Sequence, residues 1–313
     1  MNLENGLFDV NTRTLLPHSE DHLTAVQLPV RYDPAADAAV WLEFARETLP
    51  KDTQEILGQI AAWTMTPETS IQKAIALTGE GSNGKSAFLA GLRAFLGGRN
   101  VCAISLHELE THRFAAARLL GKLTNICPDL PGHKLASTAM FKALTGGDLI
   151  QGEHKYRNAF EFRPHAKLIY SANQLPASDD PTHAFARRWL IVPFEKTFDP
   201  GSAATLPRAV LDAKLAAPEA LSGLLNLALD ALPKLRSRGF TVSASMEAAF
   251  HEFRSVSDPF LVWLDQYLVD DPNREIPKRE VIDAYRKACS AERRPPMTDT
   301  ASLAVRYAKR GPP

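Results

Sequence analysis

Hydrophobic positions along this chain follow two periods, one typical of buried strands and the other typical of amphipathic helices. Short uninterrupted apolar runs predict strands, and apolar positions at helical spacing predict helices between them. The strands expected lie at residues 74–77, 123–127, 166–171 and 189–193. The helices expected lie at residues 37–48, 52–65, 85–96, 106–120, 137–144 and 207–235, the last with a restart at Pro218. Strands that alternate with helices predict an α/β fold with a mostly parallel sheet.

Regions of different character flank this α/β pattern. Two short extended pieces, 7–10 and 14–16, open a lead-in, and helical spacing returns in the tail from about residue 241. Residues 274–313 hold ten Lys and Arg against five Asp and Glu, so the tail is locally basic. The pattern predicts a helical lead-in or collar, an α/β core, a helical extension and a small basic C-terminal unit, at residues 1–66, 67–200, 201–240 and 241–313.

Composition narrows the classes of function. The 313 residues carry 36 Lys and Arg against 36 Asp and Glu, so any binding of a polyanion must use a local basic patch. Cys102, Cys127 and Cys289 are scattered, which argues against a disulfide framework or a structural zinc site and fits a reducing cytosol. The nine histidines show no metal-ligand spacing. No stretch has the length and apolarity of a signal peptide or a membrane span, so we expect a cytoplasmic protein that does not bind membranes.

The strongest motif is a glycine-rich loop between an expected strand and an expected helix. Residues 79–86 match the GxxxxGK[ST] pattern without a mismatch, and the alternative is a glycine-rich turn that binds nothing. Glycines let backbone N–H groups turn inward around phosphate oxygens, and the helix N-terminus adds its positive dipole. Lys85 would reach the β- and γ-phosphates, and the Ser86 hydroxyl would ligate Mg²⁺. The candidate nucleotide-binding residues are Gly79, Glu80, Gly81, Ser82, Asn83, Gly84, Lys85 and Ser86.

Two polar residues follow later expected strands and are candidates for the same site. After the strand at 123–127, Asp129 would be a buried carboxylate that faces Mg²⁺ and the attacking water, and a turn aspartate is the alternative. After the strand at 166–171, the amide of Asn173 would polarise the γ-phosphate or the water, and a turn residue is the alternative. Lys85, Asp129 and Asn173 follow one another at intervals of 44 residues, and this ordered series favours the catalytic interpretation.

A pair of arginines stands directly before the strand expected at 189–193. A guanidinium group stays charged at physiological pH and can stabilise charge on a transferring phosphoryl group. Arg187 and Arg188 are therefore candidate catalytic residues, and a surface ion pair with Asp179 or Asp180 is the alternative.

Taken in order, these motifs resemble the helicase domain of the phage and plasmid primase-helicase family, within superfamily 3 of the AAA+ ATPases. The resemblance covers about residues 5–290. It rests on the blocks GEGSNGKSAFL (79–89), LLGKLTNICPDL (119–130), FKALTGGDLIQGEHKY (141–156), FRPHAKLIYSANQLP (162–176) and DPTHAFARRWLIVPF (180–194). It implies an AAA+ core and, for the basic tail, a winged-helix-like DNA-binding unit with residues 299–310 as its last helix, while a mixed-charge solvated helix is the alternative. It also implies an ATP-hydrolysing helicase or translocase that forms a ring, often a hexamer, on single-stranded DNA during replication of a phage, plasmid or other mobile element.

Site roles carry over by position. The resemblance implies that residues 79–86 form Walker A and that Asp129, together with Ser86, holds Mg²⁺ at Walker B. It places Asn173 at the sensor position. Arg188, with Arg187 beside it, falls at the arginine finger that is offered to the ATP of the neighbouring subunit.

A candidate DNA contact lies between the expected strands at 123–127 and 166–171. Residues 152–157 lead into the alternating run Phe160-Glu161-Phe162, which predicts a β-hairpin. In the superfamily a basic hairpin at this place projects into the pore of the ring. Lys155 and Arg157 suit contacts with phosphates and Tyr156 could stack on a base, while a solvated hairpin tip is the alternative.

The chain departs from the family in two respects. Walker B strands of superfamily 3 commonly end in two acids, whereas here only Asp129 is present. Larger members carry an N-terminal primase domain, and the lead-in is too short to predict primase activity, which leaves a separate primase partner open. A non-unwinding, ATP-switched factor that binds or loads at an origin is therefore the alternative function. A small-molecule P-loop kinase is disfavoured by the hairpin and the arginine pair.

Overall fold

A five-stranded parallel sheet forms the centre of the computed structural model, in the order β10-β4-β9-β6-β5. The structure describes residues 1–176, 178, 183–199, 202, 206–257, 259–268 and 276–291. Four strands agree with the predicted ones to within a residue or two at either end, and the predicted parallel α/β fold is confirmed. The strands are β4 (Ala74–Thr78), β5 (Val101–Cys102), β6 (Thr124–Cys127), β9 (Lys167–Ala172) and β10 (Trp189–Pro193).

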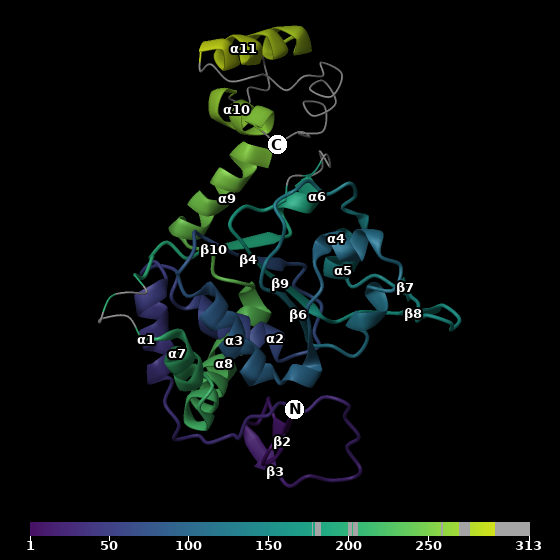
Figure 1. Cartoon of the computed structure of the whole chain (residues 1–313), viewed down its shortest axis with the longest axis vertical. Coiled ribbons are helices and arrows are strands. Elements are labelled where there is room, and N and C mark those ends of the chain that lie inside the picture. Colours follow the sequence, from purple (N-terminus) through teal and green to yellow (C-terminus); the bar gives the residue numbers. More distant parts are fainter. Residues whose placement is uncertain are drawn as a thin grey trace.

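Both faces of the sheet are covered, which explains why its strands are apolar without interruption. Side chains alternate along each strand, so Ile75 and Leu77 enter one hydrophobic core while Ala74 and Ala76 enter the other. Figure 1 shows α1, α2, α3, α7 and α8 on one side of the sheet and α4 and α5 on the other. The helices are α1 (Ala39–Thr48), α2 (Ile56–Thr64), α3 (Lys85–Leu96), α4 (Leu106–Thr111), α5 (Ala139–Gly146), α6 (His183–Ala186), α7 (Arg208–Leu215) and α8 (Pro218–Arg238).

One predicted helix is wrong in its extent. Residues 106–120 form α4 and a separate 3₁₀ turn, Ala116–Leu119, instead of one continuous helix. Ser105 starts α4 with a capping box, because its hydroxyl accepts from the Glu108 N–H and the Glu108 carboxylate accepts from the Ser105 N–H. The chain becomes extended at His112, and the next side chain, Arg113, pairs with Glu153 from a distant part of the sequence. The helix therefore ends before Arg113, and that side chain contacts a distant part of the sequence.

The lead-in forms a small antiparallel sheet of β1 (Asn2–Leu3), β2 (Gly6–Asp9) and β3 (Thr14–Leu16), as the two predicted extended pieces require. Arg13 attaches this sheet to α8, since its guanidinium pairs with Asp230 at 2.7 Å and donates to the Leu229 carbonyl at 2.8 Å. The sheet lies at the N-terminal end of the molecule in Figure 1.

The predicted restart at Pro218 is confirmed by the pair α7 and α8. Pro218 occupies the first position of α8, where its missing N–H costs no hydrogen bond. The predicted apolar face of α8, which includes Leu221, Leu225 and Leu232, is buried. No single helix in the described ranges combines the length and apolarity needed to cross a bilayer. Only α7 and α8 taken together, across a bend of 59°, meet that test.

In the described part of the chain after residue 241, three helices are present. α9 (Ala244–Ser257) packs its Phe253 into the core beside β10, so this helix adheres to the sheet. α10 (Pro259–Tyr267) and α11 (Lys278–Ala291) share a third core that includes Phe260, Trp263 and Tyr285. They lie beyond α9 at the far end of the molecule in Figure 1. The helix expected at 299–310 lies outside the described residues.

Candidate nucleotide site

The loop between β4 and α3 has a backbone shaped to surround an anion. Gly79, Ser82 and Gly84 all have positive φ angles, +134°, +56° and +94°, a kind of backbone found in anion-binding nests of N–H groups. α3 begins at Lys85 directly after the loop, so its N-terminal dipole points at the same place. The strand, loop and helix expected around the motif are therefore present.

Two of the loop glycines are required by their surroundings. A Cβ atom on Gly79 would lie 2.2 Å from the Phe194 carbonyl oxygen and 2.5 Å from Asn83 Nδ2. A Cβ atom on Gly84 would lie 2.7 Å from Cγ2 of Thr48 on α1. Gly81, in contrast, has open space around it. The loop is thus packed tightly between the end of β10 and helix α1.

Lys85 is turned onto the loop itself. Its ammonium donates to the carbonyl oxygens of Gly79 (2.5 Å) and Glu80 (2.9 Å) and to Asn83 Oδ1 (3.1 Å). The side chain is buried, and this burial lowers the pKa of Lys85 below its usual value. The three donors of the ammonium group therefore point at protein oxygens in the positions from which they could be redirected to phosphates.

Asp129 and Asn173 lie at the same edge of the sheet as the loop, because the carboxyl ends of parallel strands meet there. β9 lies between β4 and β6, and Asn173 follows it directly. The Leu130 N–H donates to the Ser171 carbonyl at 2.8 Å, which holds the segment after β6 beside the end of β9. The sequence-based expectation that Asp129 is buried is wrong, since both Asp129 and Asn173 are exposed. The turn at Pro128 carries the carboxylate past the end of the sheet into solvent.

The arginine pair lies at the opposite edge. β10 runs parallel to β4 with Trp189 beside Ala74, so Arg187 and Arg188 stand at the amino end of the sheet while Gly79 follows its carboxyl end. Arg188 is buried and donates from Nη1 to the Ala184 carbonyl at 2.7 Å. Arg187 is exposed. The assignment of Arg188, with Arg187 beside it, to an arginine finger stays a prediction, and Arg187 is the solvent-exposed member of the pair.

The predicted hairpin is present as β7 (Ile150–Gly152) and β8 (Phe160–Phe162). Lys155, Tyr156 and Arg157 are exposed at its tip, and Tyr156 is 92% exposed. The Lys155 ammonium lies 4.9 Å from the centre of the Tyr156 ring. At the base, Glu153 accepts a bidentate pair of hydrogen bonds from Arg113. The hairpin therefore presents two cations and an aromatic ring to solvent on an anchored support.

The donor set near the loop fits Mg²⁺ bound together with a nucleotide. Within the described ranges no group of three His, Cys, Asp or Glu side chains is arranged to hold a metal ion. Mg²⁺ at nucleotide sites is commonly held by one or two protein oxygens together with phosphates and water. The exposed Ser86 hydroxyl at the start of α3 and the Asp129 carboxylate match that requirement.

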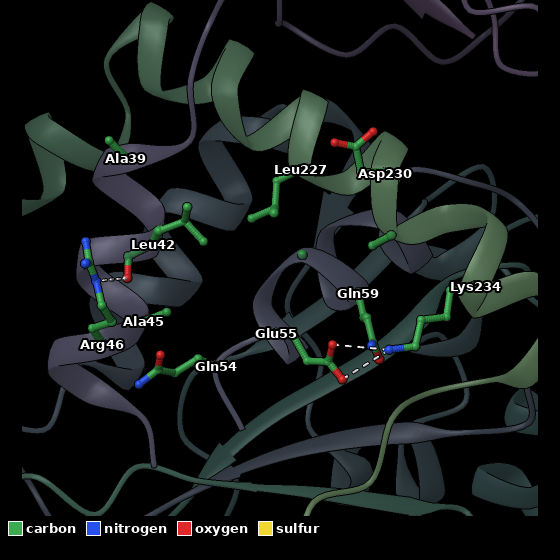
Figure 2. Close-up of a pocket in the computed structure, with 12 residues that line it drawn as sticks. Ala39, Leu42, Ala45, Arg46, Gln54, Glu55, Gln59, Leu227, Asp230 and Lys234 are labelled. Atoms are coloured by element: carbon green, nitrogen blue, oxygen red, sulfur yellow. Dashed lines mark hydrogen bonds and ion pairs between the residues drawn. The ribbon is translucent and has the colours of Figure 1, made fainter. Parts of the chain in front are cut away.

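A groove of about 620 Å³ lies away from this site, between α1, α2 and α8 (Figure 2). Leu42 and Leu227 form part of its apolar walls, and an ion pair between Glu55 and Lys234 (3.2 Å) spans one side. None of the predicted site residues lines it. Its size alone does not make it the nucleotide site.

Sequence reasoning missed the partners of the predicted residues. The Phe194 carbonyl contacts the phosphate loop, and Arg113 anchors the hairpin, yet neither carries a local motif. The sequence motif predicts Asn83 only as a position of the loop, although its amide links the loop to Phe194 at the end of β10. One signal in the sequence indicates this link, namely that a polar residue, Asn83, stands directly before the glycine and lysine of the motif.

Comparisons with known proteins agree with this architecture. Residues 1–50 match a family model described as D5 N terminal like, and residues 77–188 match a family of unknown function, DUF5906. The "Putative helicase L207/L206" of Acanthamoeba polyphaga mimivirus is 27% identical over 256 residues, which cover 75% of this chain and 26% of that protein. The chain thus spans about a quarter of the length of this curated relative.

Two solved structures share the fold. Both are apo structures of the C-terminal region of NrS-1. The A form has a TM-score of 0.52 at 12% identity, covering 78% of this chain and 62% of that chain. The second, residues 305–718, has a TM-score of 0.50 at 11% identity, covering 84% and 69%.

The sheet order defines the α/β class, and the loop between β4 and α3 carries the P-loop sequence pattern. The D5-type match at the N-terminus and the viral relative with a helicase name support the resemblance to the phage-type primase-helicase family, and the two solved structures show the shared fold.

Proposed function

We propose that this chain is the ATPase unit of a DNA helicase or translocase that acts in the replication of a phage, plasmid or other mobile element. It assembles as a ring, in which ATP and Mg²⁺ bind at the loop of one subunit and the arginine pair comes from the next. The similarity to a viral protein with a helicase name supports the reaction class.

The observation that carries the proposal is the opposite placement of the loop and the arginines. β4 and β10 pair over five residues, so their two ends are about 16 Å apart at the usual rise per residue. Arg187 therefore does not reach the phosphates bound by its own chain, and it can serve such a site only in a second copy of the chain. Arg187 is exposed, as this role requires. Arg188 donates a hydrogen bond to the Ala184 carbonyl and so holds the segment that carries both arginines.

Within one subunit each candidate site residue has its own role. Lys85 moves its donors from loop oxygens to the β- and γ-phosphates, and Ser86 and Asp129 hold Mg²⁺. Asn173 orients the γ-phosphate or the attacking water. Mg²⁺ supplies neutralisation of the charge that develops on the phosphate oxygens.

The hairpin supplies the contact with single-stranded DNA. Lys155 and Arg157 suit phosphates, and the exposed Tyr156 ring suits stacking on a base. The overall charge of zero is compatible with this role because Lys155 and Arg157 place two cations close together at the tip.

The test is the steady-state ATPase rate with and without single-stranded DNA. We expect stimulation by DNA, and we expect Lys85→Ala to abolish turnover at every DNA concentration. Turnover that persists in Lys85→Ala would remove the loop from the site.

A second candidate is favoured by Asp129, which is exposed and is the one acid in the sequence segment 123–130. With no second acid beside it, the chain could bind ATP and switch conformation as an origin-binding or loading factor without unwinding. A forked DNA substrate separates the two functions, because a loader binds the fork and leaves its strands paired.

A further inference from the structure

Asn83 is a buried amide with two different partners. It is 3% exposed, and its Oδ1 accepts from Lys85 Nζ at 3.1 Å while its Nδ2 donates to the Phe194 carbonyl at 3.0 Å. The two contacts fix the orientation of the amide, because exchanging its oxygen and nitrogen would set a donor against the ammonium and an acceptor against the carbonyl. Asn83 thus connects the phosphate-binding lysine to the end of β10.

The segment after β10 follows the loop closely. The Phe194 N–H donates to the Thr78 carbonyl and the Phe198 N–H donates to the Ser82 carbonyl, each at 2.8 Å. Gly79 approaches Phe194 so closely that a Cβ atom there would overlap its carbonyl oxygen. Because of these contacts, a displacement of the loop would also displace Phe194.

β10 joins Phe194 directly to the arginine pair. Its five residues are buried, and in the described sheet β4 is its hydrogen-bonded neighbour, since β10 lies at the edge. At the amino end, the Arg187 carbonyl accepts from Lys73 Nζ at 2.6 Å and the Arg188 carbonyl accepts from the Ala74 N–H at 2.7 Å. β10 therefore provides one short, continuous connection between Phe194 and the arginine pair.

We propose that Asn83 is a positioning residue that couples occupancy of the chain's own phosphate site to the position of Arg187 and Arg188. This inference rests on the proposed function. Lys85 has two alternative sets of acceptors, the loop oxygens or the phosphates of a nucleotide. When it turns to phosphates, Asn83 loses the contact that orients its amide, its bond to Phe194 changes, and β10 carries the change to the arginines. A bound nucleotide therefore interacts differently with the two arrangements of Lys85 and Asn83. Such a difference is what a coupling between the phosphate site and the arginines requires.

The consequence is communication around the ring. Each subunit offers its arginine to the neighbouring site in a position that depends on whether its own site holds a nucleotide. Hydrolysis at one interface is then conditional on binding at the next.

The first test is amide hydrogen exchange of peptides that cover residues 184–194, with and without a saturating non-hydrolysable ATP analogue and Mg²⁺. The variants are Asn83→Ala and the matched control Asn11→Ala, an exposed asparagine of the lead-in that is not among the site residues. Wild type and Asn11→Ala should show a nucleotide-dependent change in exchange over 184–194. Asn83→Ala should bind the analogue and show no such change.

Each other outcome overturns the inference. A nucleotide-dependent change that persists in Asn83→Ala, or that is missing in wild type with analogue bound, excludes the coupling. If Asn83→Ala cannot be saturated, Asn83 is a nucleotide-binding residue and not a positioning residue. Analogue that fails to bind wild type refutes the proposed function itself, so the two failures are distinguishable.

The second test measures the coupling in trans. Arg187→Ala chains keep the phosphate loop and lack the arginine, and Asp129→Asn chains provide the arginine without hydrolysing ATP. Mixed assemblies should recover turnover. Adding Asn83→Ala to the Asp129→Asn chain should lower the recovered rate at least about tenfold, which corresponds to an increase of about 1.4 kcal/mol in activation free energy. A purely local role of Asn83 leaves the neighbour's turnover unchanged and overturns the inference. Mixed assemblies that never recover turnover refute the shared site.

Discussion

The backbone N–H of Ala74 donates a hydrogen bond to the Arg188 carbonyl oxygen at 2.7 Å, which ties the arginine pair to the first residue of the strand that leads to the phosphate loop. Arg188 is fixed further by its own guanidinium, which donates to the Ala184 carbonyl. Arg187 extends into solvent beside it. Two adjacent arginines therefore have different surroundings, and substitution should separate their roles.

Arg187→Ala should retain the thermal stability of wild type and lose ATP hydrolysis, because its exposed side chain serves only the neighbouring subunit. Arg188→Ala should lower the free energy of unfolding by about 1–3 kcal/mol, since it removes a buried group that donates to a carbonyl. Thermal unfolding and ATPase rates of the two variants provide the measurement. Equal loss of stability in both would show that the pair acts only as structural support.

Gly79→Ala should destabilise the chain and prevent nucleotide binding. The new methyl group would overlap the Phe194 carbonyl, and the residue would have to keep a φ of +134°, which side chains rarely adopt. We expect a loss of about 1–3 kcal/mol in the free energy of unfolding. Gly81→Ala is the matched control, because nothing lies near its Cβ position. Denaturant titrations that give the same midpoint for both variants would contradict the close packing of the loop on β10.

Tyr156→Ala should weaken binding of single-stranded DNA by about 1–3 kcal/mol, the usual contribution of a base stacked on an aromatic ring. Because Tyr156 is 92% exposed, the thermal midpoint should not change. Tyr267→Ala is a control at another exposed tyrosine, 58% exposed and outside the hairpin. Fluorescence anisotropy with labelled oligonucleotides measures the affinities. Identical affinities for the two variants would favour a solvated hairpin tip without a DNA contact.

Lys167 should make stability depend on pH in a weakly alkaline range. Burial lowers the pKa of this lysine from 10.5 to about 8, while the Glu68 charge opposes the shift in part. Between these two values the unfolded chain binds more protons than the folded chain, so stability rises as pH increases from about 8 to 10.5. The contribution is about 3 kcal/mol at most.

The effect is measured as the difference between wild type and Lys167→Met, because other buried groups act in the opposite direction. Burial raises the pKa of the Cys102 thiol to about 11 and raises the pKa of Tyr170, so both favour the unfolded chain at high pH. As pH increases from 8 to 10, the ratio of folded to unfolded chain should rise in wild type relative to Lys167→Met. A difference that is independent of pH would mean that Lys167 keeps an ordinary pKa in the folded chain.

Much of the fold follows from local patterns. Strands 74–77 and 189–193 are runs of apolar residues because both faces of a parallel sheet are buried, and this composition is visible without a structure. The phosphate loop is equally local, because the glycines and Lys85 are consecutive and the backbone angles that they permit are intrinsic to the residues. For the same reason Pro218 marked the start of α8.

Other features depended on residues far apart in the sequence. The period of residues 106–120 favoured one helix, yet Arg113 leaves the helix where it meets Glu153, 40 residues later. Asp129 was expected to be buried because it follows an apolar strand, and only the direction of the turn at Pro128 exposes it. Such outcomes depend on packing between elements, which a local pattern does not encode.

The sequence by itself determined the α/β class, the phosphate loop and the hairpin, because each is set by neighbouring residues through backbone preference and side-chain period. Only the tertiary structure decided that Arg187 faces solvent while Arg188 is buried, and that both stand at the edge opposite the loop. It also brought the Asn83 amide against the Phe194 carbonyl across 111 positions of sequence. The strand order of the sheet produces these relationships, since hydrogen bonding between strands joins segments whose separation along the chain carries no signal.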